Sequence, residues 1–214
     1  MKKLLKRIIL LGLILFFGYL VYLNHLVKGA FSSEIQESEK ITRIDYSIET
    51  YPTEIVNMLL LVEDQSFFQH WGVDFKEIIR VVYGYLFENK AIRGASTITH
   101  QLINNTLLSR NKTLSRKIDE ALLAMLMELN YDKNFILERY MNTVYLAQKG
   151  SIAFHGFASA SKFYFDKKVS DLELREMATL VALLKGPSYY HPVKHPNRLN
   201  KRVNMILLKV QAIF

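Results

Sequence analysis

The sequence contains no cysteine, so disulfide bonds, cysteine nucleophiles and cysteine-ligated metals are all excluded. Proline and glycine are scarce, at 4 and 9 of 214 residues, and the chain has no internal repeats or low-complexity tracts. The six histidines lack the HExxH spacing of a zinc hydrolase, so a zinc site of that kind is not expected. Because half of the residues are hydrophobic, the composition is that of a globular protein, one domain with additions.

The charge balance is basic but uneven. The formal net charge is +8, and four of the 28 basic residues fall in the first seven positions. The remaining 24 basic residues against 20 acidic ones leave an excess of only +4. This excess is too small, without any nucleic-acid-binding motif, to indicate nucleic acid as a partner. Beside a membrane it suits anionic headgroups or a phosphate-bearing substrate.

An N-terminal apolar segment follows a basic flank. Lys2, Lys3, Lys6 and Arg7 precede an apolar run that is unbroken over residues 8–23 and continues more loosely to Val27. About 20 such residues can span a bilayer. The alternative is a cleaved signal peptide, but the run is long for one and no A-x-A site follows. We therefore expect an uncleaved membrane anchor over residues 1–27, with the basic end in the cytoplasm.

The rest of the chain divides into a polar linker and a helical domain. Residues 28–50 are polar and aperiodic and are expected to form the linker, with residues 51–214 forming the domain. Helix signals begin at Thr53, a candidate N-cap, and no strand alternation extends beyond short fragments. The class is therefore predicted to be all-α. The helical patterns cover residues from 53, 75–88, from 94, 113–130, 133–146, 171–184 and from about 197.

Two carboxylates sit where the apolar pattern points inward. Glu120 lies beside the stripe formed by Ile118, Leu122, Met125 and Leu129, three and four residues after two cations. From spacing alone a surface ion pair is the favoured interpretation. The alternative is a partly buried carboxylate, held beside two cations, that helps to neutralise a leaving phosphate.

Glu63 likewise allows a structural and a catalytic interpretation. It ends an apolar helix and is flanked by Phe67 and Phe68, so it either closes that helix or acts as a general acid or base. The segment RGASTITHQ, residues 93–101, places small and hydroxyl side chains at a helix start, which is either an anion site or an ordinary N-cap. Ser159-x-x-Lys162 matches a transpeptidase nucleophile motif, but its partner motifs are absent and we reject it.

Five segments together resemble a known family. They are EDQSFFQHWGVD, RGASTITHQL, RKIDEALLAMLMEL, ILERYMNTVYLAQKG and LELREMATLVALLKGPSYYHP. In this order and spacing they resemble the peptidoglycan glycosyltransferases of family 51, and are most similar to the glycosyltransferase module of class A penicillin-binding proteins. The resemblance covers about residues 50–210. It implies a monofunctional, membrane-anchored form, because the sequence stops where a transpeptidase domain would follow.

The resemblance implies a fold and a reaction. The fold is an all-α, lysozyme-like core with a small hydrophobic jaw that dips into the bilayer. Here the jaw would include Val82, Tyr83, Tyr85, Leu86 and Phe87, for which plain core packing is the alternative. The reaction is the polymerisation of lipid II: the 4-hydroxyl of one GlcNAc attacks C1 of MurNAc and displaces undecaprenyl pyrophosphate with inversion.

The resemblance also assigns roles to residues. Glu63 matches the general base, and Glu120 matches a second carboxylate that organises the pyrophosphate. No cofactor is required, although a divalent cation, Mg or Mn, at Glu120 is left open. The remaining matches are substrate-binding: Asp64, Phe67, His70, Ser96, Thr97, Gln101, Lys112, Arg116, Lys117, Tyr140 and Asn142.

The sequence departs from the family pattern at a few positions. His100 replaces a usual glutamine, Asn104 stands where a phosphate-contacting lysine is common, Ala147 replaces a common glycine, and Gln65 stands where arginine is frequent. Both carboxylates and the Arg116–Lys117 pair are retained, so an active enzyme is expected. The alternatives are a membrane-bound lytic transglycosylase, and a catalytically weak scaffold of a cell-wall complex.

The resemblance finally implies a location and partners. The protein would lie in the bacterial plasma membrane with its catalytic domain on the outer face. Its partners would be lipid II, the nascent glycan strand, the membrane, and transpeptidases or other cell-wall synthesis proteins.

Overall fold

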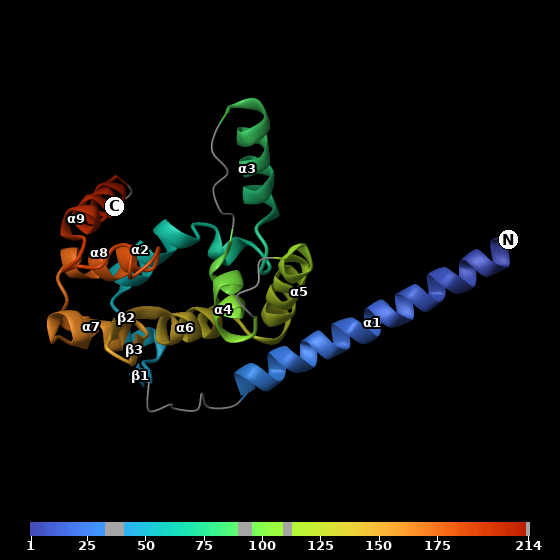
Figure 1. Cartoon of the computed structure of the whole chain (residues 1–214), viewed down its shortest axis with the longest axis horizontal. Coiled ribbons are helices and arrows are strands. Elements are labelled where there is room, and N and C mark those ends of the chain that lie inside the picture. The colour runs from blue at the N-terminus through green and yellow to red at the C-terminus, as the bar shows by residue number, and fades with distance from the viewer. Residues whose placement is uncertain (33–40, 90–95, 109–112, 213–214) are drawn as a thin grey trace.

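The computed structural model describes residues 1–32, 41–89, 96–108 and 113–212. Helices dominate these residues, and one of them, α1, extends far from the rest (Figure 1). The α-helices are α1 Lys2–Ser32, α2 Thr53–Glu63, α3 Phe75–Phe87, α4 Ile98–Thr106, α5 Leu114–Asn130, α6 Lys133–Thr143, α7 Phe157–Phe165, α8 Leu174–Leu183 and α9 Pro196–Gln211. Short 3₁₀ turns occupy Ile48–Thr50, Phe67–Gln69 and Val169–Asp171. The prediction of an all-α class is confirmed.

A small sheet accompanies the helices. Its strands are β1 Ile41–Arg43, β2 Tyr145–Lys149 and β3 Ile152–His155, in the order β1-β3-β2. β3 pairs antiparallel with β2 and parallel with β1. The helix expected over residues 133–146 therefore ends early, at Thr143, because Val144 is extended and Gly150 turns the chain into a hairpin. A strand of five residues is too short for its alternation to stand out in the sequence.

The core is built around α2. Its Ile55, Met58 and Leu59 are buried, and the helix packs against α8 and α9. α4 packs against α5 and α6 on the neighbouring side. Thr53 begins α2 but does not cap it, because Pro52 takes the N-cap position and makes no side-chain cap hydrogen bond.

The buried face of α5 is not the predicted stripe. Leu123, Ala124 and Met127 are buried, whereas Ile118 and Leu129 are 55% and 69% exposed. The cause is that α5 packs against both α1 and α4, so more than one face of its apolar C-terminal half is covered. Glu120 shares the buried face with Leu123, Ala124 and Met127.

Helix α3 projects from the domain (Figure 1). Asp74 caps its N-terminus by accepting a 2.9 Å hydrogen bond from the backbone N–H of Glu77. The apolar residues expected in a jaw are all at least half exposed: Val82, Tyr83, Tyr85, Leu86 and Phe87. Their interpretation as plain core packing is therefore wrong, and α3 presents an unpartnered apolar surface within the part of the chain described.

Helix α1 has two parts. Apart from the partly buried Leu20, its large apolar side chains are exposed as far as Tyr22, and it is long and apolar enough to cross a membrane. From Leu23 onward it docks on the domain, with Leu23, Val27 and Phe31 buried at four-residue intervals.

Two side-chain hydrogen bonds tie α1 to α5. Tyr19 donates to Asp119 over 2.6 Å, and Asn130 donates to Asn24 over 2.7 Å. The segment expected as a linker, 28–50, thus starts inside a helix. Its last ten residues contain β1 and a 3₁₀ turn that packs on α6.

Candidate active site

The Glu63 carboxylate lies at the C-terminal end of α2 and is partly exposed. Its Oε2 accepts a 3.0 Å hydrogen bond from the Gln101 side-chain amide, which comes from the first turns of α4. Gln101 Oε1 in turn accepts a 2.9 Å hydrogen bond from the Tyr140 hydroxyl of α6. Since the Tyr140 bond identifies the acceptor end of the amide, the donor end must face Glu63.

Tyr140 is completely buried. Burial raises the pKa of its hydroxyl well above the usual value, and the negative charge of Glu63 raises it further. The hydroxyl therefore keeps its proton and remains a donor to Gln101.

Arg202, on the C-terminal helix α9, lies near the other carboxylate oxygen of Glu63. Its Nη2 lies 3.9 Å from Glu63 Oε1, and its Nε donates to the carbonyl oxygen of Ala182 over 3.2 Å. Sequence reasoning did not identify Arg202. Its position among other cations on an amphipathic helix carries no signal that separates it from a surface residue.

Asp64 turns away from its neighbour Glu63. Its Oδ2 accepts a 2.9 Å hydrogen bond from the backbone N–H of Ile98, in the first turn of α4. Both of its oxygens also lie 3.1 Å from His70 Nε2. An anion at a helix N-terminus is favourable because the free backbone N–H groups and the helix dipole point at it. Asp64 therefore anchors the helix that carries Gln101.

The N-terminus of α4 is closed by Thr97 and His100. Thr97 Oγ1 accepts from the backbone N–H of His100 over 3.1 Å and donates to the carbonyl oxygen of Gly72 over 2.7 Å. The backbone N–H of Thr97 donates to His100 Nδ1 over 3.2 Å. Burial lowers the pKa of His100 to about 4, so this ring is neutral near pH 7. Of the two interpretations of this segment, the N-cap is the one that the geometry supports.

Gly72 allows this arrangement. It has a φ of +77°, and a Cβ there would lie 2.5 Å from the backbone carbon and oxygen of Ala124 in α5. Only glycine combines that backbone conformation with such a close approach. The loop that contains His70 is thereby held against the helix that contains Glu120.

Glu120 is fully buried. Lys117 Nζ lies 2.5 Å from its Oε1, and Arg116 Nη1 lies 3.2 Å from its Oε2. Arg116 also donates to Asn104 Oδ1 over 2.6 Å, and Lys117 lies 3.4 Å from Ser96 Oγ. The interpretation of Glu120 as part of a surface ion pair is therefore wrong. The carboxylate is buried, and about half of the Lys117 side chain is exposed above it.

Helix α4 connects the two carboxylates. Gln101 contacts Glu63, and Asn104, one turn further along, contacts the Arg116 that binds Glu120. Residues three apart share one face of a helix. We call Glu63, Gln101, Tyr140 and Arg202 one carboxylate cluster, and Glu120, Arg116, Lys117 and Asn104 the other. Both clusters border the same face of α4, about one helical turn apart along its axis.

Phe67 and Asn142, two other expected site residues, have their contacts away from Glu63 and Glu120. Asn142 is buried and exchanges hydrogen bonds with the backbone of Tyr46, so it holds the segment before α2. Phe67 is buried, with Lys133 Nζ 4.4 Å from its ring centroid. Lys112 lies outside the described residues.

Within the described part of the chain, no group of three or more histidine, aspartate or glutamate side chains could hold a metal ion. Both Glu120 oxygens are already taken by Arg116 and Lys117. A divalent cation prefers several oxygen ligands. The two Glu120 oxygens, each already paired with a cation, do not fit such an ion.

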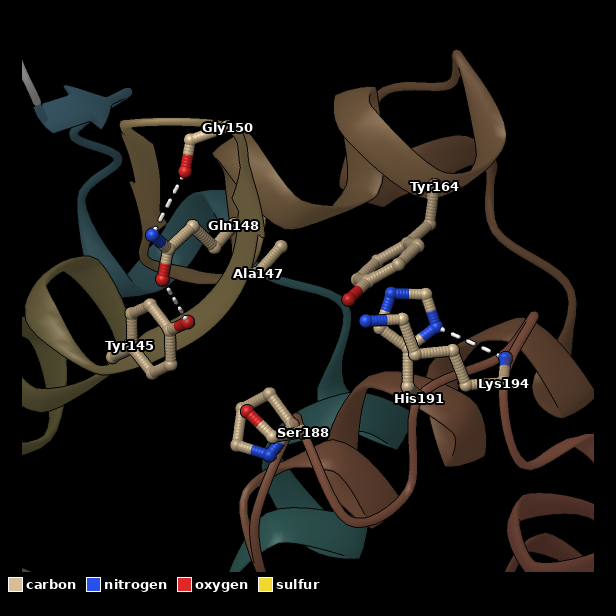
Figure 2. A pocket seen from close by; sticks show the side chains of 9 residues that line it. Tyr145, Ala147, Gln148, Gly150, Tyr164, Ser188, His191 and Lys194 are labelled. Carbon is tan, nitrogen blue, oxygen red and sulfur yellow. Dashed lines mark hydrogen bonds between the residues drawn. The ribbon is translucent and has the colours of Figure 1, made fainter.

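A pocket lies elsewhere, between the β2–β3 hairpin, Tyr164 of α7 and the loop between α8 and α9 (Figure 2). Of the assigned site residues that the structure describes, none lines it. The carboxylates therefore do not sit in this hollow.

Comparison with known proteins shows the family to which this chain is similar. The family model for transglycosylases matches residues 28–211. Penicillin-binding protein 1B of Haemophilus influenzae is 37% identical over 171 residues, covering 80% of this chain and 22% of that protein. Penicillin-binding protein 1A of Neisseria lactamica is 44% identical over 160 residues, covering 75% and 20%. Penicillin-binding protein 1B of Escherichia coli is 40% identical over 161 residues, covering 75% and 19%. The chain thus spans about a fifth of the length of these relatives.

Proposed function

The chain belongs to the transglycosylase family, and from that premise we propose that it polymerises lipid II into peptidoglycan glycan strands. The observation that carries the proposal is the pair of carboxylate clusters on one face of α4. One cluster has a carboxylate that can accept a proton, and the other has cations that can bind a leaving phosphate. Glycosyl transfer from a lipid pyrophosphate needs these two groups close together.

In the proposed reaction, Glu63 is the general base. The 4-hydroxyl of the acceptor sugar attacks C1 of the donor MurNAc and gives its proton to Glu63 as the new O4–C1 bond forms. The Gln101 amide keeps one carboxylate oxygen in place, which leaves Oε1, beside Arg202, to receive the proton. Attack from the face opposite the leaving group inverts the configuration at C1.

The leaving group is undecaprenyl pyrophosphate, which departs with the electron pair of the C1–O bond. Its negative charge would be balanced by Lys117 and Arg116, both of which form ion pairs with the buried Glu120 carboxylate. Because Glu120 is buried, it acts on the pyrophosphate through these cations. We propose that no cofactor takes part, since the arranged donors do not fit a metal and the two cations supply the charge.

The same proposal sets the orientation in the membrane. The apolar part of α1 would span the bilayer with its basic end in the cytoplasm, and the exposed face of α3 would enter the outer leaflet. The catalytic domain would then meet lipid II at the outer surface. Transpeptidases that cross-link the product are the proposed partners.

Incubating the full chain in detergent with fluorescent lipid II tests this function. We expect the precursor to be consumed and long glycan strands to appear on a polyacrylamide gel. Cleavage of preformed glycan without growth would instead indicate a lytic transglycosylase. No turnover of either substrate would indicate a scaffold.

A further inference from the structure

The pocket in Figure 2 has a volume of about 270 Å³. A space of this size holds more than one water molecule and suits one small polar group with its neighbours. The hairpin forms one wall, through Tyr145, Ala147, Gln148 and Gly150. The loop between α8 and α9 forms the other, through Pro187, Ser188, His191 and Lys194, and Tyr164 closes one side.

The polar groups of the hairpin wall are already paired with one another. Tyr145 donates to Gln148 Oε1 over 3.1 Å, and Gln148 Nε2 donates to the carbonyl oxygen of Gly150 over 2.9 Å. Tyr164 donates to the carbonyl oxygen of Leu146 over 3.1 Å, and burial raises its pKa to about 12. This wall therefore offers flat tyrosine rings and few free donors.

The loop wall has the opposite character. His191 Nδ1 accepts hydrogen bonds from the backbone N–H groups of Val193 and Lys194, so its ring proton lies on Nε2 and is free to be donated. The Lys194 ammonium and the Ser188 hydroxyl have no hydrogen-bond partner among the residues that the structure describes. Among the described residues, no aspartate or glutamate lines the pocket. Three donors, one of them charged, thus face a space without a negative group.

From this arrangement we infer that the pocket binds the carboxylate end of a short peptide, with the carboxylate at Lys194, His191 and Ser188 and the adjoining side chains against the tyrosine rings. A single ammonium with two neutral donors matches a carboxylate, whereas phosphate is usually met by several cations or an arginine fork.

The position of the pocket indicates which peptide this is. Its loop wall also carries Tyr190, whose ring centroid lies 5.3 Å from the guanidinium of Arg202, the residue beside Glu63. The hairpin lies on the opposite side of the molecule from the N-terminal end of α1 (Figure 1). This step rests on the proposed function: the ligand is the peptide attached to the muramyl sugar of the substrate. That peptide would extend away from the lipid while the sugar lies at Glu63.

Calorimetry on the full chain in detergent tests this inference without catalysis. The probe is N-acetylmuramyl pentapeptide, compared with the same molecule amidated at its C-terminus and with a peptide-free disaccharide. We expect Lys194→Met to weaken binding of the free acid about tenfold, as loss of one charge-assisted contact does. Amidation of the probe should weaken binding to the unchanged protein similarly. Lys168→Met, which removes an exposed lysine that does not line the pocket, should leave binding unchanged.

Equal binding of the acid and the amide, or of the unchanged protein and Lys194→Met, would overturn the inference. So would equally tight binding of the peptide-free disaccharide, which would make the pocket a saccharide site. If lipid II is polymerised but the probe does not bind, the pocket assignment fails and the proposed function stands. If the probe binds as expected but no polymer forms, the proposed function fails.

Discussion

Tyr140 and Glu63 are joined through the two ends of one amide. Tyr140 donates to Gln101 Oε1 over 2.9 Å, and Gln101 Nε2 donates to Glu63 Oε2 over 3.0 Å. The chain of bonds runs from a fully buried hydroxyl to a partly exposed carboxylate. It fixes the orientation of the carboxylate from inside the core, on the side away from solvent.

Tyr140→Phe should reduce catalysis without abolishing folding. The change leaves Gln101 Oε1 without its donor and frees the amide to rotate, so the carboxylate loses its fixed orientation. We expect kcat for lipid II polymerisation to fall about tenfold, a barrier change of about 1.4 kcal/mol, with little change in KM. Initial rates with fluorescent lipid II measure this effect.

Tyr51→Phe is the matched control. Tyr51 is also buried, but its hydroxyl donates to Asn142 Oδ1 over 2.7 Å, away from both carboxylates. Each substitution should lower the free energy of unfolding by about 1 kcal/mol. If both variants lost the same share of kcat, the orienting role of Tyr140 would be wrong.

Glu120→Gln should remove most of the activity. The amide cannot hold two cations as the carboxylate does, so Arg116 and Lys117 would lose the arrangement that we propose receives pyrophosphate. We expect kcat/KM to fall by about a hundredfold or more, in the range of losing a preorganised charge. The free energy of unfolding should fall by about 1–3 kcal/mol, since two charge-assisted hydrogen bonds to a buried acceptor are weakened.

Glu176→Gln separates the two effects of that change. Glu176 pairs with Lys167 over 2.8 Å and lies in α8, outside both carboxylate clusters. It should lower stability slightly and leave polymerisation intact. A Glu120→Gln enzyme with normal kcat/KM would contradict the assignment of the cation cluster.

The buried His100 makes stability depend on pH. Its folded pKa of about 4 is below the ordinary value of 6.5, so the folded state resists protonation that the unfolded state accepts. The stabilisation from the neutral ring is complete above pH 6.5 and is lost as the pH falls from 6.5 to 4. The loss is on the order of 3 kcal/mol, at about 1.4 kcal/mol per pH unit.

Denaturant unfolding between pH 7 and 4 measures this loss. His100→Gln should flatten the pH dependence over that window, whereas His195→Gln, at an exposed position, should not. Unchanged slopes in His100→Gln would show that other groups cause the acid sensitivity.

The docking of α1 on α5 can be tested by cross-linking, because the chain has no cysteine of its own. Asn24→Cys combined with Asn130→Cys places two thiols where side chains now meet at 2.7 Å. A short bifunctional thiol reagent should join them within one chain, seen as a shift on a denaturing gel. Tyr22→Cys with Asn130→Cys should react poorly, because Tyr22 is 55% exposed. Equal yields would mean that α1 is not docked as described.

The helical class and most helix positions follow from the sequence because apolar periodicity over ten or more residues is a strong signal. The buried face of α5 does not follow, since apolar residues surround its C-terminal half and the choice depends on α1 and α4 packing there. For the same reason the burial of Glu120 cannot be read from its spacing to Arg116 and Lys117. The sequence did not predict the short sheet, because its strands depend on pairing with one another rather than on a local sequence pattern.

The candidate site was likewise predictable from the sequence only in part. Glu63, Gln101, Arg116 and Lys117 could be named from motifs that lie in one order along the chain. Arg202 could not, because its contact with Glu63 exists only after α9 folds back on α2.

The most direct test of the account is the polymerisation rate of Glu63→Gln. The amide has nearly the same shape and can still accept the Gln101 hydrogen bond, but it cannot take a proton from the attacking hydroxyl. We predict that glycan synthesis from fluorescent lipid II falls at least a hundredfold while the protein remains folded and still binds lipid II. Glycan synthesis within threefold of the unchanged protein would contradict the role of Glu63 as the general base.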